Sequence, residues 1–69
     1  MAFQLTARGE AEAVKVNRPM GPETTVIAFL YREGRPTEAE DIMEETRMGE
    51  EKATRVLKRL INLGYVEEV

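Results

Sequence analysis

Residues 50–69 read EEKATRVLKRLINLGYVEEV, and this stretch decides the fold of the chain. Its aliphatic side chains recur at the spacing of a helix with one apolar face, which carries Ala53, Val56, Leu57 and Leu60. Gly64 can take the left-handed conformation that ends many helices. The sequence therefore predicts a helix over residues 50–63, which leads through Gly64 into a short strand at 65–69.

The middle of this helix contains four cations and no acid: Lys52, Arg55, Lys58 and Arg59. Lys52, Arg55 and Arg59 fall within an arc of about 60° on another side of the helix from the apolar face. The chain as a whole is acidic, with 10 Lys and Arg against 13 Asp and Glu. This balance argues against a protein that coats nucleic acid without specificity, but it leaves one local basic face.

An earlier helix is predicted over residues 22–33. Pro22 suits the first turn, where its missing N–H costs no hydrogen bond, and Gly34 follows the last turn as a cap. Between them, apolar residues form one stripe at helical spacing: Val26, Ile27 and Leu30. This segment is the first of three predicted helices.

The helix between these two is predicted over residues 37–46. Thr37-Glu38-Ala39-Glu40 has the pattern of a capping box, in which the Thr37 hydroxyl accepts from the Glu40 amide and the Glu40 carboxylate accepts from the Thr37 amide. The buried face would hold Ala39, Ile42 and Met43, and the other face is acidic, with Glu38, Asp41, Glu44 and Glu45. A short turn over 47–49 separates this helix from the basic one.

Residues 1–17 are compatible with two structures. Phe3, Leu5 and Ala7 alternate with polar residues, which favours a strand at 3–6. Residues 10–17 can form either a second strand after a turn at Gly9, or part of a helix over about 7–16 that Thr6 would cap. Both alternatives remain open from the sequence.

The composition excludes several classes of chemistry. The chain has no Cys and no His, which removes disulfides, thiolate and imidazole metal ligands and Ser-His triads. No nucleophile–base pair, Gly-rich phosphate loop or Asp/Gly calcium loop is present. We therefore expect no enzyme, no catalytic residues, no metal site and no cofactor.

The length and the apolar runs indicate a single small domain. Sixty-nine residues form one core at most, and a core of this size gains stability from a dimer interface. The longest apolar run is far too short to cross a bilayer, and no basic-then-apolar leader opens the chain. We expect a cytoplasmic protein with no membrane partner.

At this point the sequence resembles a known family. Residues 53–66 look like the recognition helix and first wing strand of winged helix-turn-helix transcription regulators, notably those of the multiple-antibiotic-resistance type, and residues 36–42 look like the preceding helix of that motif. The resemblance covers residues 22–69. It implies a mainly α fold with a small β-sheet, in which residues 1–18 form an N-terminal strand or arm and residues 19–69 form a three-helix winged helix-turn-helix domain.

The resemblance also implies a function, namely sequence-specific binding of double-stranded DNA by a small transcription regulator. Lys52, Thr54 and Arg55 match the positions that reach the major groove in DNA-binding relatives, and Lys58 and Arg59 match positions that can approach the backbone. Thr hydroxyls and the amides at a helix start can hold phosphates, so Thr37 is included among the expected contacts. The third helix would lie in the major groove.

The chain departs from the family pattern in its wing. The usual second wing strand has no counterpart after residues 65–69, and a lone strand leaves its backbone groups unpaired. Residues 3–11 weakly resemble the strand-to-helix segment that follows the wing in the family. We therefore expect a truncated wing and a small sheet that pairs 3–6 with 65–69.

The acidity of the chain keeps a second function open. Glu50 and Glu51 lie at the start of the basic helix, and acids at that position repel phosphates. A monomer would bind DNA weakly, so useful affinity would require a homodimer that reads two half-sites. The alternative is a winged-helix protein–protein interaction module that never binds DNA.

Overall fold

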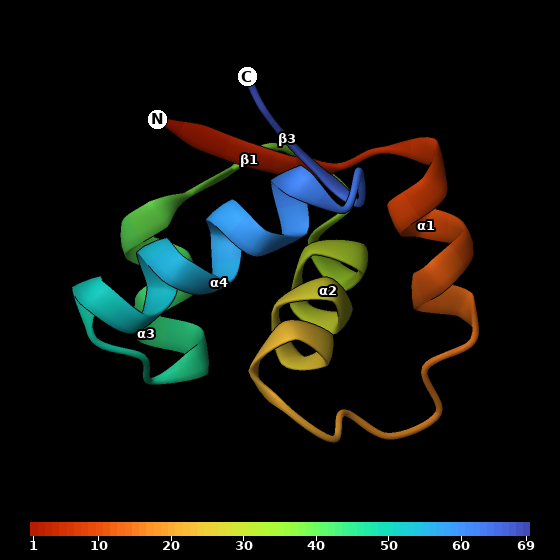
Figure 1. Cartoon of the computed structure of the whole chain (residues 1–69), viewed down its shortest axis with the longest axis horizontal. Helices are drawn as coiled ribbons and strands as arrows, with labels where there is room; N and C mark the ends of the chain where they lie inside the picture. Colours follow the sequence, from red (N-terminus) through yellow and green to blue (C-terminus); the bar gives the residue numbers. More distant parts are fainter.

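Helix α2 runs through the middle of the molecule, and the other elements are arranged around it (Figure 1). The computed structural model describes all 69 residues. In chain order its elements are β1 (Ala2–Leu5), α1 (Ala7–Val14), α2 (Pro22–Glu33), β2 (Thr37–Glu38), α3 (Ala39–Thr46), α4 (Glu50–Asn62) and β3 (Val66–Glu68). The expectation of a mainly helical chain with a small sheet is confirmed.

The sheet has three antiparallel strands in the order β2-β1-β3. Its middle strand comes from the start of the chain, and β3 comes from the end: Phe3 pairs with Glu68 and Leu5 with Val66. The predicted pairing of the N-terminal strand with the C-terminal strand is confirmed. The third strand, β2, was not predicted.

The prediction of a capping box at Thr37 is wrong. Thr37 lies in β2, opposite Phe3 of β1, and its hydroxyl donates to the Arg35 carbonyl at 3.0 Å. Helix α3 begins two residues later, with Glu38 as its cap and no side-chain hydrogen bond at the cap. The backbone of residues 37 and 38 completes the free edge of β1, and this pairing replaces the first predicted turn of the helix.

The open question at residues 10–17 is settled in favour of a helix. Helix α1 covers residues 7–14, so the chain has four helices and not three. Thr6 begins it by accepting a hydrogen bond from the Gly9 amide at 3.1 Å, and its hydroxyl donates to the Gly64 carbonyl at 2.6 Å. One threonine therefore caps α1 and ties it to the turn before β3.

The glycines at the ends of α2 and α4 take the predicted roles. Gly34 ends α2 in a left-handed conformation with φ of 66°, and Gly64 has φ of 83°. After Gly64 the chain turns back, and the Tyr65 amide donates to the Leu60 carbonyl at 2.9 Å. This turn places β3 directly beside β1.

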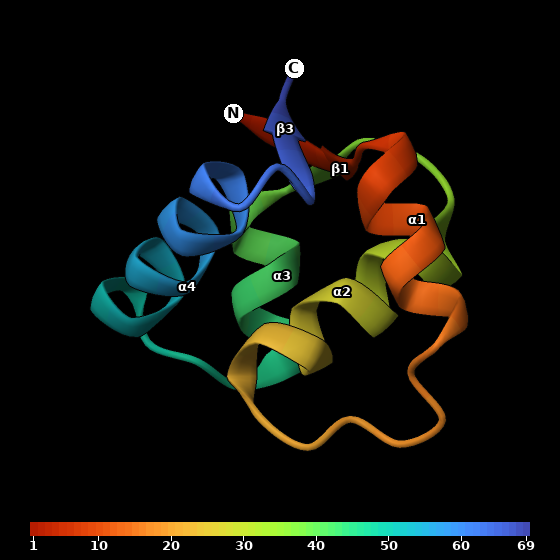
Figure 2. The same ribbon diagram turned by 45° about the vertical axis from the view of Figure 1, so that its right-hand side comes forward.

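The core lies between the sheet and helices α2, α3 and α4 (Figure 2). The predicted apolar face of α4 is buried as a set: Ala53, Val56, Leu57 and Leu60. Val26 and Ile42 are fully buried at its centre, and Phe3 and Ala13 join the same core from the N-terminal segment. Because these residues hold α4 by one face, its other face is left in solvent.

Candidate nucleic-acid interface on helix α4

Helix α4 presents its basic side chains to solvent. Gly49 caps the helix, and Glu50 and Glu51 occupy the first turn, where acids stabilise the helix dipole. The exposed residues of the basic segment are Lys52, Thr54, Arg55, Lys58 and Arg59. Neither the acidic face of α3 nor the N-terminal segment covers them.

Three of these cations gather in one concavity. It lies between α4 and the start of α2, and its lining comprises Pro22, Glu23, Lys52, Arg55, Val56 and Arg59. Lys52 and Arg55 form no ion pair, whereas the Arg59 Nε lies 3.7 Å from the Glu23 carboxylate. The concavity therefore holds two cations without an ion-pair partner, Lys52 and Arg55, and a third, Arg59, that is paired with Glu23.

Glu23 is a member of this site that sequence reasoning missed. Its carboxylate lies on the first turn of α2, more than one element away from Arg59 in the chain. Both side chains are substantially exposed, 39% for Glu23 and 69% for Arg59. The contact depends on how α2 crosses α4, and no local pattern in the sequence encodes that crossing.

Thr54 and Lys58 lie on the opposite flank of α4. They line a second, mostly apolar groove against β1, together with Met1, Phe3, Ala39, Leu57, Ile61 and Glu68. The structure therefore separates two residues of the predicted DNA-contact set from the other three on α4. The groove itself had no signal in the sequence, because its walls come from both ends of the chain.

Thr37 does not belong to either surface. Its side chain is 5% exposed, and its hydroxyl is used by the Arg35 carbonyl. A residue buried in the sheet and already bonded has no free group to offer a phosphate. Thr37 is therefore structural in this fold.

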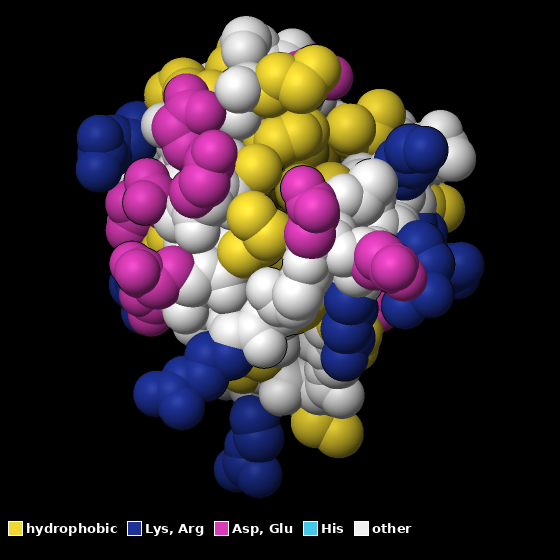
Figure 3. Space-filling model, turned by 90° about the vertical axis from the view of Figure 1, so that its left-hand side faces the viewer, with side chains coloured by type: hydrophobic (Ala, Val, Ile, Leu, Met, Phe, Trp, Pro, Cys, Tyr) yellow, Lys and Arg dark blue, Asp and Glu magenta, His cyan; other side chains and the backbone are white.

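Charge is distributed unevenly over the face that carries α3 and α4. In Figure 3, most acidic side chains gather on the left and most Lys and Arg side chains on the right and at the lower edge, although acidic side chains also lie on the right and a basic group lies at the upper left. A band of hydrophobic side chains lies between them. The exposed acids of α3 are Glu40, Asp41, Glu44 and Glu45.

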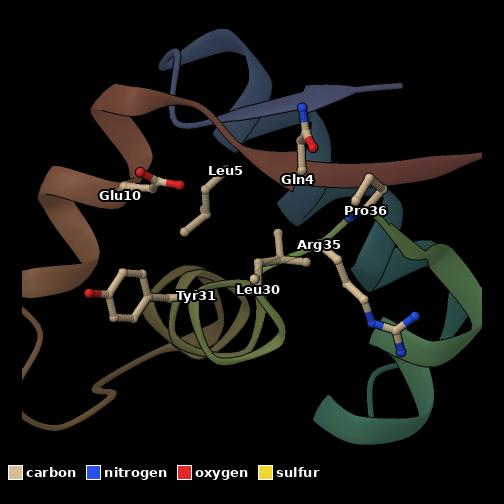
Figure 4. Close-up of a pocket in the computed structure, with 8 residues that line it drawn as sticks. Gln4, Leu5, Glu10, Leu30, Tyr31, Arg35 and Pro36 are labelled. Carbon is tan, nitrogen blue, oxygen red and sulfur yellow. The ribbon is translucent and has the colours of Figure 1, made fainter.

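A third cleft lies between α1, β1 and the end of α2, and its polar groups do not converge (Figure 4). Figure 4 shows Glu10 reaching in from α1, while the Arg35 guanidinium points away toward α3. Arg35 pairs with Glu33 at 3.6 Å, and the Gln4 amide donates to Glu67 at 2.7 Å. With these groups engaged elsewhere, the cleft offers no set of side chains aimed at one ligand.

The chain brings no three potential metal-ligating side chains together. None of the four helices combines the length and the apolar character that crossing a bilayer demands. Comparison with protein-family models, with curated proteins and with solved structures found no match for this chain.

Proposed function

We propose that this chain is a winged helix-turn-helix domain that binds double-stranded DNA, as part of a small cytoplasmic transcription regulator. The observation that carries the proposal is the exposed concavity of Lys52, Arg55 and Arg59 on the solvent face of α4. An α-helix fits the major groove of B-DNA, and cations on both sides of its exposed face suit the phosphates that border the groove.

The three cations have different roles in this proposal. Arg55 lies between Lys52 and Arg59 along the exposed face of α4, so it is the side chain that approaches base edges. Its guanidinium can make a bidentate contact to guanine. Lys52 and Arg59 line the same concavity on either side of Arg55 along the helix and are assigned to backbone phosphates. Thr54 and Lys58 remain secondary candidates, since they lie on the flank toward β1.

The order of the elements supports a winged-helix assignment. Helices α2, α3 and α4 follow one another with β2 between the first two and β3 after the last. Strand β1 lies against β3 as a second wing strand would, although it comes first in the chain. In this assignment the wing is divided between the two chain ends, and a wing tip contributes nothing to DNA binding.

The acids around α4 limit the affinity. Glu23 lies within the concavity, Glu50 and Glu51 begin the helix, and the chain carries a formal net charge of −3. The two cations assigned to phosphates, Lys52 and Arg59, give a slope of about −2 for log K against log salt concentration. The proposal therefore requires weak binding that is detectable at low salt and lost at high salt.

The double substitution Arg55→Ala/Arg59→Ala tests this function. It removes a base contact and a phosphate contact, and we expect affinity for a DNA library at low salt to fall at least about 30-fold. The salt slope should fall to about −1. Fluorescence anisotropy over a salt series measures both quantities.

The matched control is Lys15→Ala/Arg18→Ala, which removes the same charge from the end of α1 and the segment after it, on the far side of α2 from α4 (Figure 1). This control should retain most of the affinity. Equal losses in the two double variants, or no detectable binding by the natural chain at low salt, would contradict the proposal.

Glu23→Gln is expected to strengthen DNA binding. The substitution releases Arg59 from its carboxylate partner and removes a negative charge from the phosphate path, for a gain of about two- to fivefold at low salt. Glu33→Gln is the control, because it breaks another Arg–Glu pair at the opposite end of the same helix. An equal gain in both variants would show that net charge alone is responsible.

The apolar groove between α4 and β1 favours a second candidate function, that of a protein-interaction module. Its walls include Met1 and Ile61, which are 78% and 36% exposed. Exposed apolar surface with a polar rim is typical of protein-binding sites. If the chain shows no DNA binding, we propose this groove as the surface through which it binds another protein.

A further inference from the structure

The groove between β1 and α4 is the most apolar concavity of the molecule. Five of its eight lining residues are hydrophobic: Met1, Phe3, Ala39, Leu57 and Ile61. Phe3 and Leu57 form its floor, because they are only 8% and 5% exposed, and Met1 and Ile61 form exposed edges. Covering this surface removes apolar side chains from water and is therefore favourable.

The two charged residues of the groove have opposite signs and come from different walls. Lys58 lies on α4, and Glu68 lies on β3. Neither forms an ion pair with the other or with any other residue of the chain. By contrast, Glu38 beside the groove is already paired with the N-terminal ammonium of Met1 at 3.2 Å.

This arrangement is complementary to itself. A two-fold axis through an interface places each residue of one copy opposite a different residue of the other copy, and the second contact repeats the first. A two-fold axis that passes through the groove between Lys58 and Glu68 would bring Lys58 of each copy to Glu68 of the other. On the wider surface most acidic side chains lie on one side of the apolar band and most basic ones on the other, although acidic side chains also lie beside the basic ones (Figure 3).

We propose that the groove between β1 and α4 is the interface of a symmetric homodimer, closed by reciprocal Lys58–Glu68 ion pairs over the apolar floor. The inference concerns the flank of α4 opposite the principal DNA-contact residues and does not depend on DNA binding, although it uses Lys58, a secondary candidate for DNA contact. The cationic concavity of Lys52, Arg55 and Arg59 lies toward α2 and stays outside the groove.

The size of the chain sets how far the interface must extend. A standard interface buries about 800 Å² per partner, and this chain exposes 4722 Å² in total. About a sixth of the surface would then be covered, which is more than the groove alone provides. The charged surfaces on both sides of the groove must therefore also be buried in the interface. The association then depends on whether these surfaces carry opposite charges.

Charge reversal tests this interface. Lys58→Glu and Glu68→Lys each place like charges at both ion pairs of the symmetric dimer, and each should raise the dimer dissociation constant at least about tenfold. An equimolar mixture of the two variants restores both pairs across a heterodimer. Sedimentation equilibrium of each variant alone and of the mixture measures these constants without any DNA.

The expected result is a concentration-dependent dimer for the natural chain, weaker association for each variant, and recovery to within about threefold of the natural constant in the mixture. Lys15→Glu on the far side of the molecule is the charge control and should leave the constant unchanged. Both target side chains are exposed, so each variant should remain folded. Circular dichroism checks this. A natural chain that stays monomeric, a dimer insensitive to the single reversals, or a mixture that does not recover would each overturn the proposal.

Discussion

Replacing Gly9 with alanine is expected to unfold the domain or to detach α1 from it. Gly9 is buried in α1 and faces the turn before β3, where an added Cβ would overlap the backbone carbonyl of Tyr65. Leu5 Cδ2 lies 3.1 Å from the same position. A backbone carbonyl cannot rotate aside as a side chain can, so α1 must move.

Two opposing effects determine how much Gly9→Ala lowers the free energy of unfolding. Alanine favours a helix over glycine by about 1 kcal/mol, which would stabilise α1 if the position were open. Overpacking of a buried site costs about 1–3 kcal/mol and sometimes more, and α1 is also tied to this turn through Thr6. Because the added Cβ would overlap a backbone carbonyl, we take the upper end of this range and expect a net loss of about 2 kcal/mol in the free energy of unfolding. Thermal denaturation should show a fall in Tm of about 10 °C.

Gly49→Ala is the matched control for this substitution. No atom lies within 4 Å of the Cβ that it would add, and the Gly49 φ of −72° suits any residue. Its Tm should stay within a few degrees of the natural value. A Gly9→Ala variant that is as stable as the Gly49→Ala control would show that α1 does not pack closely on Tyr65.

Replacing Leu60 with alanine is expected to have an effect of similar or greater size. Leu60 is 1% exposed and lies in the core beneath β3. Removing a buried leucine side chain costs about 2–5 kcal/mol, because transfer free energy is lost and a cavity remains. A core of this size supplies only about 3–5 kcal/mol in total, so the substitution should remove about half or more of the free energy of unfolding.

Ile61→Ala provides the comparison, since the neighbouring side chain has 36% exposure and lies on the groove flank. It should lower stability far less than Leu60→Ala. Urea denaturation followed by circular dichroism measures both free energies. Similar losses for the two variants would mean that α4 is rotated about its axis from the position described.

The sequence predicted α4 well because its pattern is local. The burial of Ala53, Val56, Leu57 and Leu60 and the turn at Gly64 each depend on neighbours within one or two helical turns. The same holds for Pro22 and Gly34 at the ends of α2. Strong helical periodicity with suitable end residues identifies such elements without knowledge of their tertiary partners.

The errors came from contacts between distant segments. The Thr37 side chain is of a type that often caps helices. Its backbone, however, pairs with Phe3, a residue far from it in the sequence but adjacent to it in the sheet. The alternatives left open at residues 10–17 also depended on a distant segment, since Thr6 bonds both Gly9 and Gly64. The candidate site was divided for the same reason, since α2 supplies Glu23 to one flank of α4 and β1 supplies Phe3 to the other.

The position of β1 also affects the order in which the molecule can assemble. The strand that comes first in sequence is the middle strand of the sheet, and its longer ladder is made with β3, the last strand of the three. Pairing β1 with β3 closes a loop that spans nearly the whole chain. The entropy lost in closing this loop is offset only by the contacts that form once both strands are in place. The contiguous helices can therefore form their contacts early in folding, whereas the ladder that pairs Phe3 with Glu68 and Leu5 with Val66 forms last and completes the domain.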